Sequence, residues 1–257
     1  MKIKNVVYKL KEIYRKLSVP QFTIVTGLII IIFGTLILSS PLCSSSDVGL
    51  WEAFFTSTSA ITVTGLTIID VGVDLNIFGQ IFLALMLLSG GLGLMAITTF
   101  LQGFVVKGTQ LRTRLDKGKT LDEFGVGGIG RTFQSIAITA TSIISFGAMV
   151  LYFFGFLEIQ NNWQRLWSAI FHSISAYNNA GFSLWSNSLQ DYRSNFVVNI
   201  VFIFLIVMGG LGWRVIDDIW SNRKNLSYKK LSLHSRLVIR TSFSLIIFGS
   251  LGFFVTE

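Results

Sequence analysis

The sequence has little charge and few of the residues that build reactive centres. Of its 257 residues, 13% are charged, and the chain contains one cysteine and two histidines. A single cysteine, Cys43, excludes an internal disulfide and a metal site made of several cysteines. The two histidines, His172 and His234, leave little material for a metal or catalytic centre, and no base with a suitable partner accompanies the serines and threonines. We therefore expect no enzymatic chemistry and no cofactor in this chain.

Hydrophobic residues, by contrast, make up 51% of the sequence and give it a mean hydropathy of +0.64. These values are far from those of a soluble domain. About 20 helical residues cross a ~30 Å hydrocarbon core. We expect five such crossings, over residues 22–40, 78–101, 135–157, 195–213 and 237–255. A cleaved signal peptide is the alternative for the first, because a basic region precedes it.

The net charge of +8 is explained by membrane topology. With these crossings, every lysine and arginine except Arg165 and Arg193 lies on the same side as the amino terminus, with Arg240, at the beginning of the last crossing, counted on that side. Because lysine and arginine accumulate in cytoplasmic loops, this bias predicts a cytoplasmic amino terminus. We expect a multi-pass protein of the cell membrane whose basic loops contact lipid headgroups. The same distribution argues against nucleic acid as a partner.

Two further apolar stretches, residues 50–60 and 163–176, are too short to cross and have the length of re-entrant helices. They belong to an internal repeat. Aligning Gly65 with Gly181 also aligns Leu50, Trp51, Ala53, Phe55, Ser57, Ser59 and Ala60 with Leu166, Trp167, Ala169, Phe171, Ser173, Ser175 and Ala176. A glycine at the same place in both copies indicates one architectural task performed twice.

Each short stretch leads into a segment that ends in glycine. Glycine has no Cβ and accepts positive φ, so consecutive main-chain carbonyls can turn to one side. A ring of such carbonyls can replace the water shell of a cation. The simpler alternative is that Gly65 and Gly181 only terminate helices. Similarly, the hydroxyls of Thr62 and Thr64 either face a pore or cap and pack. The amides of Asn178 and Asn179 either bind an ion or brace the loop.

The order of helix, re-entrant helix, glycine loop and helix, present twice with outward-facing loops, is the unit of potassium-channel-like pores. Residues 59–66 and 175–182, together with the Gly-Gly-Leu-Gly clusters at 90–93 and 209–212, resemble the Trk/Ktr/HKT superfamily. The resemblance is closest to the Ktr-type membrane subunit, the pore subunit of bacterial potassium uptake systems, and covers essentially the whole chain.

The resemblance implies an all-α membrane fold in which four such units surround one pore and each donates one filter glycine. Potassium is then the transported ion, and sodium stimulation is left open. A glycine rather than a serine at position 65 is similar to the potassium-preferring pattern of the superfamily. The ion-binding residues that the resemblance implies are Thr62, Val63, Thr64, Gly65, Asn178, Asn179, Ala180 and Gly181.

The resemblance also implies a homodimer and a cytoplasmic regulatory ring of nucleotide-binding subunits. The expected organisation is a cytoplasmic segment (1–21), a first pore repeat (22–101), a cytoplasmic loop (102–134), a second pore repeat (135–213), a cytoplasmic loop (214–236) and the first helix of an incomplete third repeat (237–257). We expect a fragment rather than two copies that share a filter. The alternative functions are a non-conducting truncated or assembly subunit and a sodium-permeable member of the superfamily.

Several other features have a structural and a functional interpretation. Asp70 and Asp74 either attract cations to an outer mouth or are ordinary loop carboxylates. For His172 we favour a structural hydrogen bond over proton sensing. For the two glycine clusters we favour helix packing over gating hinges.

The remaining features lie in the expected cytoplasmic loops. The glycine run at 125–130 is expected to be a flexible elbow rather than a nucleotide-binding loop, because no strand precedes it. Arg214 has the helical spacing for surface ion pairs with Asp217 and Asp218, although contact with a regulatory partner is the alternative.

Overall fold

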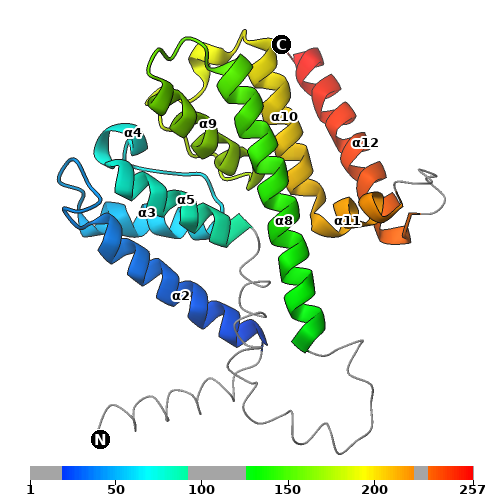
Figure 1. Cartoon of the computed structure of the whole chain (residues 1–257), viewed down its shortest axis with the longest axis horizontal. Helices are drawn as coiled ribbons and strands as arrows, with labels where there is room; N and C mark the ends of the chain where they lie inside the picture. Colours follow the sequence, from blue (N-terminus) through cyan, green and yellow to red (C-terminus); the bar gives the residue numbers. More distant parts are fainter. Residues whose placement is uncertain (1–18, 92–125, 223–230, 257) are drawn as a thin grey trace, which may run out of the picture.

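The computed structural model of the chain describes residues 19–91, 126–222 and 231–256 (Figure 1). These residues form helices, and the only extended pairing among them is an isolated bridge between Ser44 and Leu75. In chain order the elements are α2 (Val19–Leu38), α3 (Leu50–Thr62), α4 (Val71–Asp74), α5 (Ile77–Gly91), α8 (Val126–Val150), the π-helical turn η1 (Leu151–Gly155), α9 (Asn162–Tyr177), the 3-10 turn η2 (Gln190–Tyr192), α10 (Phe196–Leu211), α11 (Trp213–Ser221) and α12 (Leu233–Thr256).

The helices form two groups with the same order. In the first group, α3 packs against α2 and α5, and in the second group, α9 packs against α8 and α10. Contacts between α5 and α9 join the groups. Figure 1 shows the two groups next to each other, with α12 beyond α10 at the far edge. The middle helix of each group, α3 or α9, is the short helix that the sequence predicts, and each leads into a glycine loop.

Polar side chains cap the first turns of several helices. Asn161 Oδ1 accepts hydrogen bonds from the main-chain N–H groups of Trp163 and Gln164 at the beginning of α9. Asn195 caps α10 in the same way. At the start of α3, the Glu52 carboxylate accepts a hydrogen bond of 2.6 Å from Gly49 N. Such caps satisfy main-chain donors that a helix leaves unpaired in its first turn.

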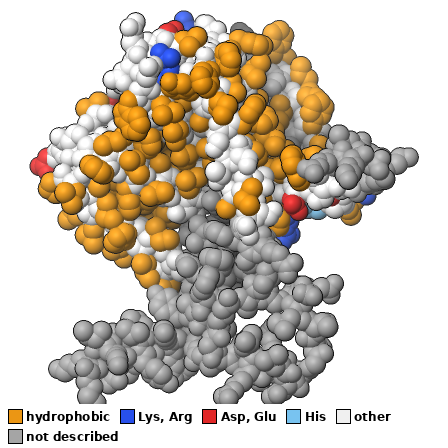
Figure 2. Space-filling view, in the orientation of Figure 1, with side chains coloured by type: hydrophobic (Ala, Val, Ile, Leu, Met, Phe, Trp, Pro, Cys, Tyr) orange, Lys and Arg blue, Asp and Glu red, His pale blue; other side chains and the backbone are white. Residues whose placement is uncertain are grey.

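The outer faces of the helices are apolar. Leu83, Leu87 and Leu205 are fully buried between helices, whereas Phe33 and Phe248 are 58% and 72% exposed. Figure 2 shows that hydrophobic side chains cover most of the visible surface, with charged side chains near its upper and lower edges. A soluble monomer rarely exposes so much contiguous apolar surface. The fold is that of an all-α membrane protein.

Residues Gln134–Gly155 and Leu233–Thr256 are long and apolar enough to cross a membrane, and α10 with α11 qualifies as one bent pair. The apolar helices Thr23–Leu38 and Ile77–Gly91 are shorter. The expected second crossing, 78–101, is described only to Gly91. The rest of it lies outside the described residues, as do 1–18 and 92–125, which contain most of the expected amino-terminal segment and of the first cytoplasmic loop.

Two boundaries differ from the sequence prediction. Of the glycine run expected to be an elbow, residues 126–130 lie in the first turns of α8, which begins at Val126 rather than near Ser135, and residue 125 lies outside the described residues. A helical glycine costs only about 1 kcal/mol relative to alanine, so it does not prevent a helix from forming. The expected loop 214–236 likewise contains α11 and the start of α12.

Candidate functional site

The candidate site is formed by the segments that follow α3 and α9, here called loop 1 (residues 62–66) and loop 2 (residues 178–182). In loop 1, Val63 has a left-handed backbone with φ of 54°, and Gly65 has φ of 82°. The chain is held against the end of α3 by a hydrogen bond of 2.9 Å from Thr64 N to Ser59 O. A left-handed residue after the last helical turn is a common way to end a helix, although it usually is glycine.

Loop 2 repeats this backbone position by position. Asn179 has φ of 55° and Gly181 has φ of 73°. Ala180 N donates a 2.8 Å hydrogen bond to Ser175 O. When Gly65 is aligned with Gly181, Asn179 corresponds to Val63 and Ala180 to Thr64, so equivalent positions have the same backbone roles in both loops. The glycines are therefore more than helix ends, because each is the second of two left-handed positions in a repeated turn.

The structure brings the two loops together. A Cβ placed on Gly65 would lie 2.6 Å from the main-chain oxygen of Ala180 and 3.4 Å from the Cα of Gly181. A Cβ on Gly181 would have Gly65 Cα as its nearest neighbour, also at 3.4 Å. Glycine is thus required at position 65 both by the positive φ and by the close approach of loop 2.

A serine one turn before each helix end braces each loop. Ser59 Oγ accepts a 2.9 Å hydrogen bond from Leu66 N. Ser175 Oγ donates a 2.7 Å hydrogen bond to Phe182 O. The two hydroxyls hold equivalent positions with opposite polarity, which is possible because a hydroxyl both donates and accepts. This role was not predicted from the sequence, although both serines occur in the aligned repeat.

Side chains of the predicted site residues mostly bond within the protein. Thr62 Oγ1 lies 2.8 Å from Thr58 O and 2.6 Å from Thr64 Oγ1. Asn178 Nδ2 donates to Ile174 O at 2.8 Å, and Asn179 Nδ2 to Ile206 O at 3.4 Å. These contacts fit the bracing interpretation of the hydroxyl groups and the amide nitrogens. Asn178 Oδ1, by contrast, is buried and accepts no hydrogen bond from the described residues.

The main-chain oxygens in the middle of each loop differ from these side chains. Within the described residues, no hydrogen bond is accepted by the carbonyl of Val63, Thr64 or Gly65, nor by that of Asn179, Ala180 or Gly181. Unpaired carbonyls at two adjacent loops are oxygen ligands suited to a hard cation. The chemistry that this site can perform is therefore coordination rather than proton or group transfer.

The glycine clusters let the following helix pass close to each loop. A Cβ on Gly90 would lie 2.5 Å from Ile61 O at the end of α3. A Cβ on Gly209 would overlap Tyr177 O at the equivalent end of α9. A Cβ on Gly91 would overlap the Asn178 side chain. Of the two clusters predicted to be packing sites, Gly90, Gly91 and Gly209 thus make close contacts, whereas a Cβ on Gly210 or Gly212 would meet nothing within 4 Å. Residues 92 and 93 lie outside the described residues.

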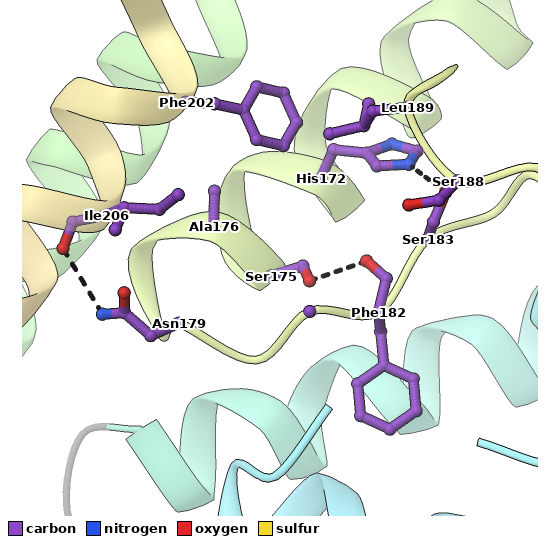
Figure 3. A pocket seen from close by; sticks show the side chains of 11 residues that line it. His172, Ser175, Ala176, Asn179, Phe182, Ser183, Ser188, Leu189, Phe202 and Ile206 are labelled. Atoms are coloured by element: carbon purple, nitrogen blue, oxygen red, sulfur yellow. Dashed lines mark hydrogen bonds between the residues drawn. The ribbon is translucent and has the colours of Figure 1, made fainter. Parts of the chain in front are cut away.

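His172 lies in a pocket of about 260 Å³ beside loop 2, which Asn179, Phe182 and Phe202 also line (Figure 3). Its Nδ1 lies 2.8 Å from Ser168 O, and because a carbonyl only accepts, Nδ1 carries the proton. Nε2 lies 3.1 Å from Ser183 Oγ and accepts from Leu184 N at 3.4 Å. Both ring nitrogens are thus engaged, as expected for a structural histidine.

The two aspartates after loop 1 stabilise the segment between loop 1 and α5. Asp70 Oδ1 caps α4 by accepting from Gly72 N at 3.0 Å. Asp74 Oδ2 accepts from Asp70 N, and its Oδ1 accepts from Ser46 Oγ, both at 2.8 Å. These hydrogen bonds give both carboxylates a structural role, whatever their field contributes to cation approach.

An all-helical arrangement with an apolar exterior, as the described residues have, defines an α-helical membrane protein. Residues 34–256 match the TrkH family, described as cation transport protein. The chain belongs to this family. That description names a transport class and not an enzyme, in agreement with the absence of a catalytic centre expected from the sequence.

Three relatives illustrate the similarity. The chain is 32% identical over 239 residues to the Ktr system potassium uptake protein B of Bacillus subtilis (strain 168), covering 93% of this chain and 53% of that protein. It is 30% identical over 240 residues to the protein of the same name from Vibrio alginolyticus, covering 93% and 52%. It is 32% identical over 250 residues to the potassium/sodium uptake protein NtpJ of Enterococcus hirae, covering 96% and 54%. The chain thus spans about half the length of each relative.

Proposed function

We propose that this chain supplies two of the loops of a potassium uptake pore, with loops 1 and 2 forming part of a selectivity filter. The observation that carries the proposal is the repeated backbone of the two loops, which lie against each other at Gly65 and Gly181. In this proposal an entering ion gives up water and gains fixed carbonyl dipoles, with no covalent step.

The proposed ion ligands are main-chain oxygens rather than side chains. The carbonyls of Val63, Thr64 and Gly65, and those of Asn179, Ala180 and Gly181, support this assignment because none accepts a hydrogen bond from the described residues. Thr62 and Asn178 complete the proposed set at the ends of the two loops. Their side chains bond to the preceding helical turns, which leaves support of the loop as their main contribution.

The proposed orientation has a cytoplasmic amino terminus and filter loops that face outside. It rests on the distribution of lysine and arginine. In this orientation α3 and α9 are re-entrant helices that enter from outside. Their lengths of 13 and 16 residues correspond to about 20 and 24 Å, shorter than the ~30 Å hydrocarbon core.

A complete filter in this proposal needs four loops, so two more must come from a further half or from a second copy. The named Ktr relatives belong to a potassium uptake system. From this resemblance we propose a homodimer that is regulated by a ring of cytoplasmic nucleotide-binding subunits. The name of the Enterococcus relative, a potassium/sodium uptake protein, favours sodium permeation or coupling as the second candidate function.

Ion flux into liposomes tests the proposal. We would compare this chain alone with a chimera in which the carboxyl-terminal half of the Bacillus subtilis relative follows it, using the intact Bacillus protein as the control. Potassium flux only in the chimera is the expected result. Selective flux from the chain alone would show that copies share a filter and would overturn the need for a further half. A folded chimera that passes no cation would contradict the pore assignment.

A further inference from the structure

A side-chain hydrogen bond joins the two groups of helices near the beginning of α5. Trp167 Nε1, on α9, donates to Gln80 Oε1, on α5, at 2.7 Å. Gln80 Nε2 donates to Leu75 O, in the segment before α5, at 2.9 Å. An amide has a donor end and an acceptor end. Gln80 therefore binds its own group through the nitrogen and the short helix of the next group through the oxygen.

The second group has an equivalent of Gln80 at Asn199. Asn76 caps α5 and Asn195 caps α10, and aligning these caps places Asn199 at the position of Gln80. Asn199 Nδ2 donates to Asn195 O at 2.8 Å and to Arg193 O at 3.0 Å, in the segment before α10. All hydrogen bonds of this side chain to described residues use Nδ2. The oxygen, which in Gln80 binds the next group, thus has no donor in the described part of the chain.

The side of α10 that carries Asn199 is uncovered, whereas the equivalent side of α5 is buried. Residues three, four and seven positions apart lie on one side of a helix. On α5 the residues at these positions include Ala84 and Leu87, which are both buried. On α10 their equivalents, Ile203 and Ile206, are 61% and 44% exposed. The same positions are therefore covered in the first group and open in the second.

The difference belongs to this side alone. A Cβ on Gly91, farther along the same side of α5, would overlap the Asn178 side chain of the second group. A Cβ on the equivalent Gly210 would meet nothing within 4 Å. Positions that face the core of each group do not differ, because the equivalent Met86 and Leu205 are both buried. The first group is covered here by the short helix and loop of the second, and the second group has an open copy of the same surface.

We propose that this side of α10 is a docking surface for the short helix of a third repeat, with Asn199 Oδ1 accepting a hydrogen bond from an N–H group of that helix. The α10 docking surface consists of Asn199, Ile203, Ile206 and Gly210. The inference rests on the proposed function, in which two further loops complete the filter. Its physical basis is the equivalent surface of α5, which packs against a helix of this kind.

The position of α12 favours a third repeat over a second copy of this chain as the occupant. Each short helix packs against the first helix of its own group, α3 against α2 and α9 against α8. α12, the expected first helix of a third repeat, packs against α10 and α11 (Figure 1). A short helix that packs against α12 would therefore lie near α10. A second copy would have to bring its own α2 to a place beside α12.

The opposite edge of the chain has the complementary group. Trp51, which aligns with Trp167, is 77% exposed. Its ring stacks on Phe54 of the same helix at a centroid distance of 5.6 Å. The two groups together thus have one completed link, an exposed indole at one edge and an amide oxygen without a donor at the other. In a ring of four repeats, the indole of Trp51 would meet the last repeat as Trp167 meets Gln80.

Spin labels on α10 test the proposal. With Cys43→Ser and without other cysteines, Ile203→Cys would be labelled in the chain alone and in the chimera, both in vesicles of phosphatidylcholine and phosphatidylglycerol. Collision with oxygen reports exposure to lipid. We expect the collision rate at 203 to be at least about threefold lower in the chimera, because a close-packed interface excludes oxygen.

Ile200→Cys is the matched control. Ile200 is 48% exposed, and its equivalent on α5, Ile81, is 41% exposed although the second group packs against α5. This position is therefore outside the surface that a neighbouring repeat covers. The collision rate at 200 should be the same in the chain alone and in the chimera.

Two results with the label at 203 would overturn the proposal. Equal collision rates in the folded chain and the folded chimera would show that this side of α10 faces lipid. A rate that is already low in the chain alone would show that a second copy covers it. Ile206→Cys repeats the test if the Ile203 variant does not fold. Because no transport is measured, protection at 203 in a chimera that passes no cation would contradict the pore and not the docking surface.

Asn199→Leu tests the hydrogen bond to the third repeat. The variant loses the bonds of Nδ2 in both the chain alone and the chimera, but it loses a partner of Oδ1 only in the chimera. We therefore expect the larger loss of stability in the chimera, measured by unfolding in detergent. Equal losses would show that Asn199 Oδ1 accepts no hydrogen bond from the added half.

Discussion

Loops 1 and 2 have the same backbone conformation, but different side chains pack behind them. Behind loop 2, the His172 ring stacks on Trp185 with a centroid distance of 4.1 Å, and Phe156 and Tyr192 each lie within about 5 Å of the same indole. In loop 1 the aligned positions of His172 and Trp185 are Thr56 and Ile69, so no such stack is available. A repeated turn can thus be retained while the aromatic packing behind it differs.

The residues after the two glycines differ in the same way. Phe182 is 3% exposed, whereas the equivalent Leu66 is 60% exposed. Figure 3 shows the Phe182 ring directed away from its own loop, toward helices of the first group. Loop 2 is therefore enclosed on a side where loop 1 is open. What remains common is the main-chain turn and the serine brace, which identifies these as the parts that the proposed function requires.

The largest difference between the loops is expected when a methyl group is added at each glycine. Gly65→Ala should destabilise the fold by about 2–5 kcal/mol, because left-handed strain of about 1–2 kcal/mol adds to the overlap with Ala180 O. Gly181→Ala has strain but ordinary contacts and should lose about 1–2 kcal/mol. Unfolding in detergent measures both. Equal losses would show that loop 2 does not approach Gly65 as described.

The second-largest loss of stability is expected when the imidazole ring of His172 behind loop 2 is removed. His172→Ala deletes the stack on Trp185 and the hydrogen bonds to Ser168, Ser183 and Leu184, and should cost about 2–4 kcal/mol. Thr56→Ala is the matched change behind loop 1. Its buried hydroxyl makes no hydrogen bond to the part of the chain that the structure describes, so the loss should be under about 1 kcal/mol.

Thermal unfolding of these two variants tests whether the packing behind loop 2 stabilises the fold more than the packing behind loop 1. A Thr56 variant as unstable as the His172 variant would contradict it. His172→Gln can restore hydrogen bonds but has no imidazole ring. It should recover only part of the stability lost in His172→Ala, because the ring stack stays absent.

A smaller difference in stability is expected between variants of the two serines that brace the loops. Ser175→Ala leaves the oxygen of buried Phe182 without its donor and should cost about 1–2 kcal/mol. Ser59→Ala frees the N–H of exposed Leu66, which water can reach, and should cost less than about 1 kcal/mol. Amide hydrogen exchange at Leu66 should accelerate in the Ser59 variant alone. Unchanged exchange there would show that Ser59 does not brace loop 1.

The smallest effect is expected outside the loops, at the α4 cap that follows loop 1. Asp70→Asn keeps an oxygen that can accept from Gly72 N, so stability should change by less than about 0.5 kcal/mol. Ion uptake at low salt by the chimera separates the two interpretations of Asp70. Uptake equal to that of the parent fits a cap. A clear fall would show that the charge itself attracts cations.

Much of this arrangement could be predicted from local sequence. The lengths of the apolar stretches indicated the helices, and the aligned Gly65 and Gly181 indicated two equivalent turns. The contact between the loops was not predictable, because it depends on how α5 packs against α9. The stack of His172 on Trp185 was missed for the same reason, since the two rings come from separate segments.

Other features were missed because the local signal was ambiguous. A glycine run is compatible with both an elbow and a helix, and tertiary packing decides between them at the start of α8. Gly212 is one of four residues in a glycine-rich cluster, and nothing in the pattern marks it as the corner between α10 and α11. The bracing serines could have been identified, because Ser59 and Ser175 are identical and aligned.

The central claim is that loops 1 and 2 together line one cation path. The most direct test measures potassium against sodium flux in the chimera with Gly65→Ser and, separately, with Gly181→Ser. The account predicts that each variant lowers the preference for potassium, with folding verified by thermal unfolding. A preference that stays unchanged in both folded variants would contradict the claim, because ions would then cross without contacting either loop.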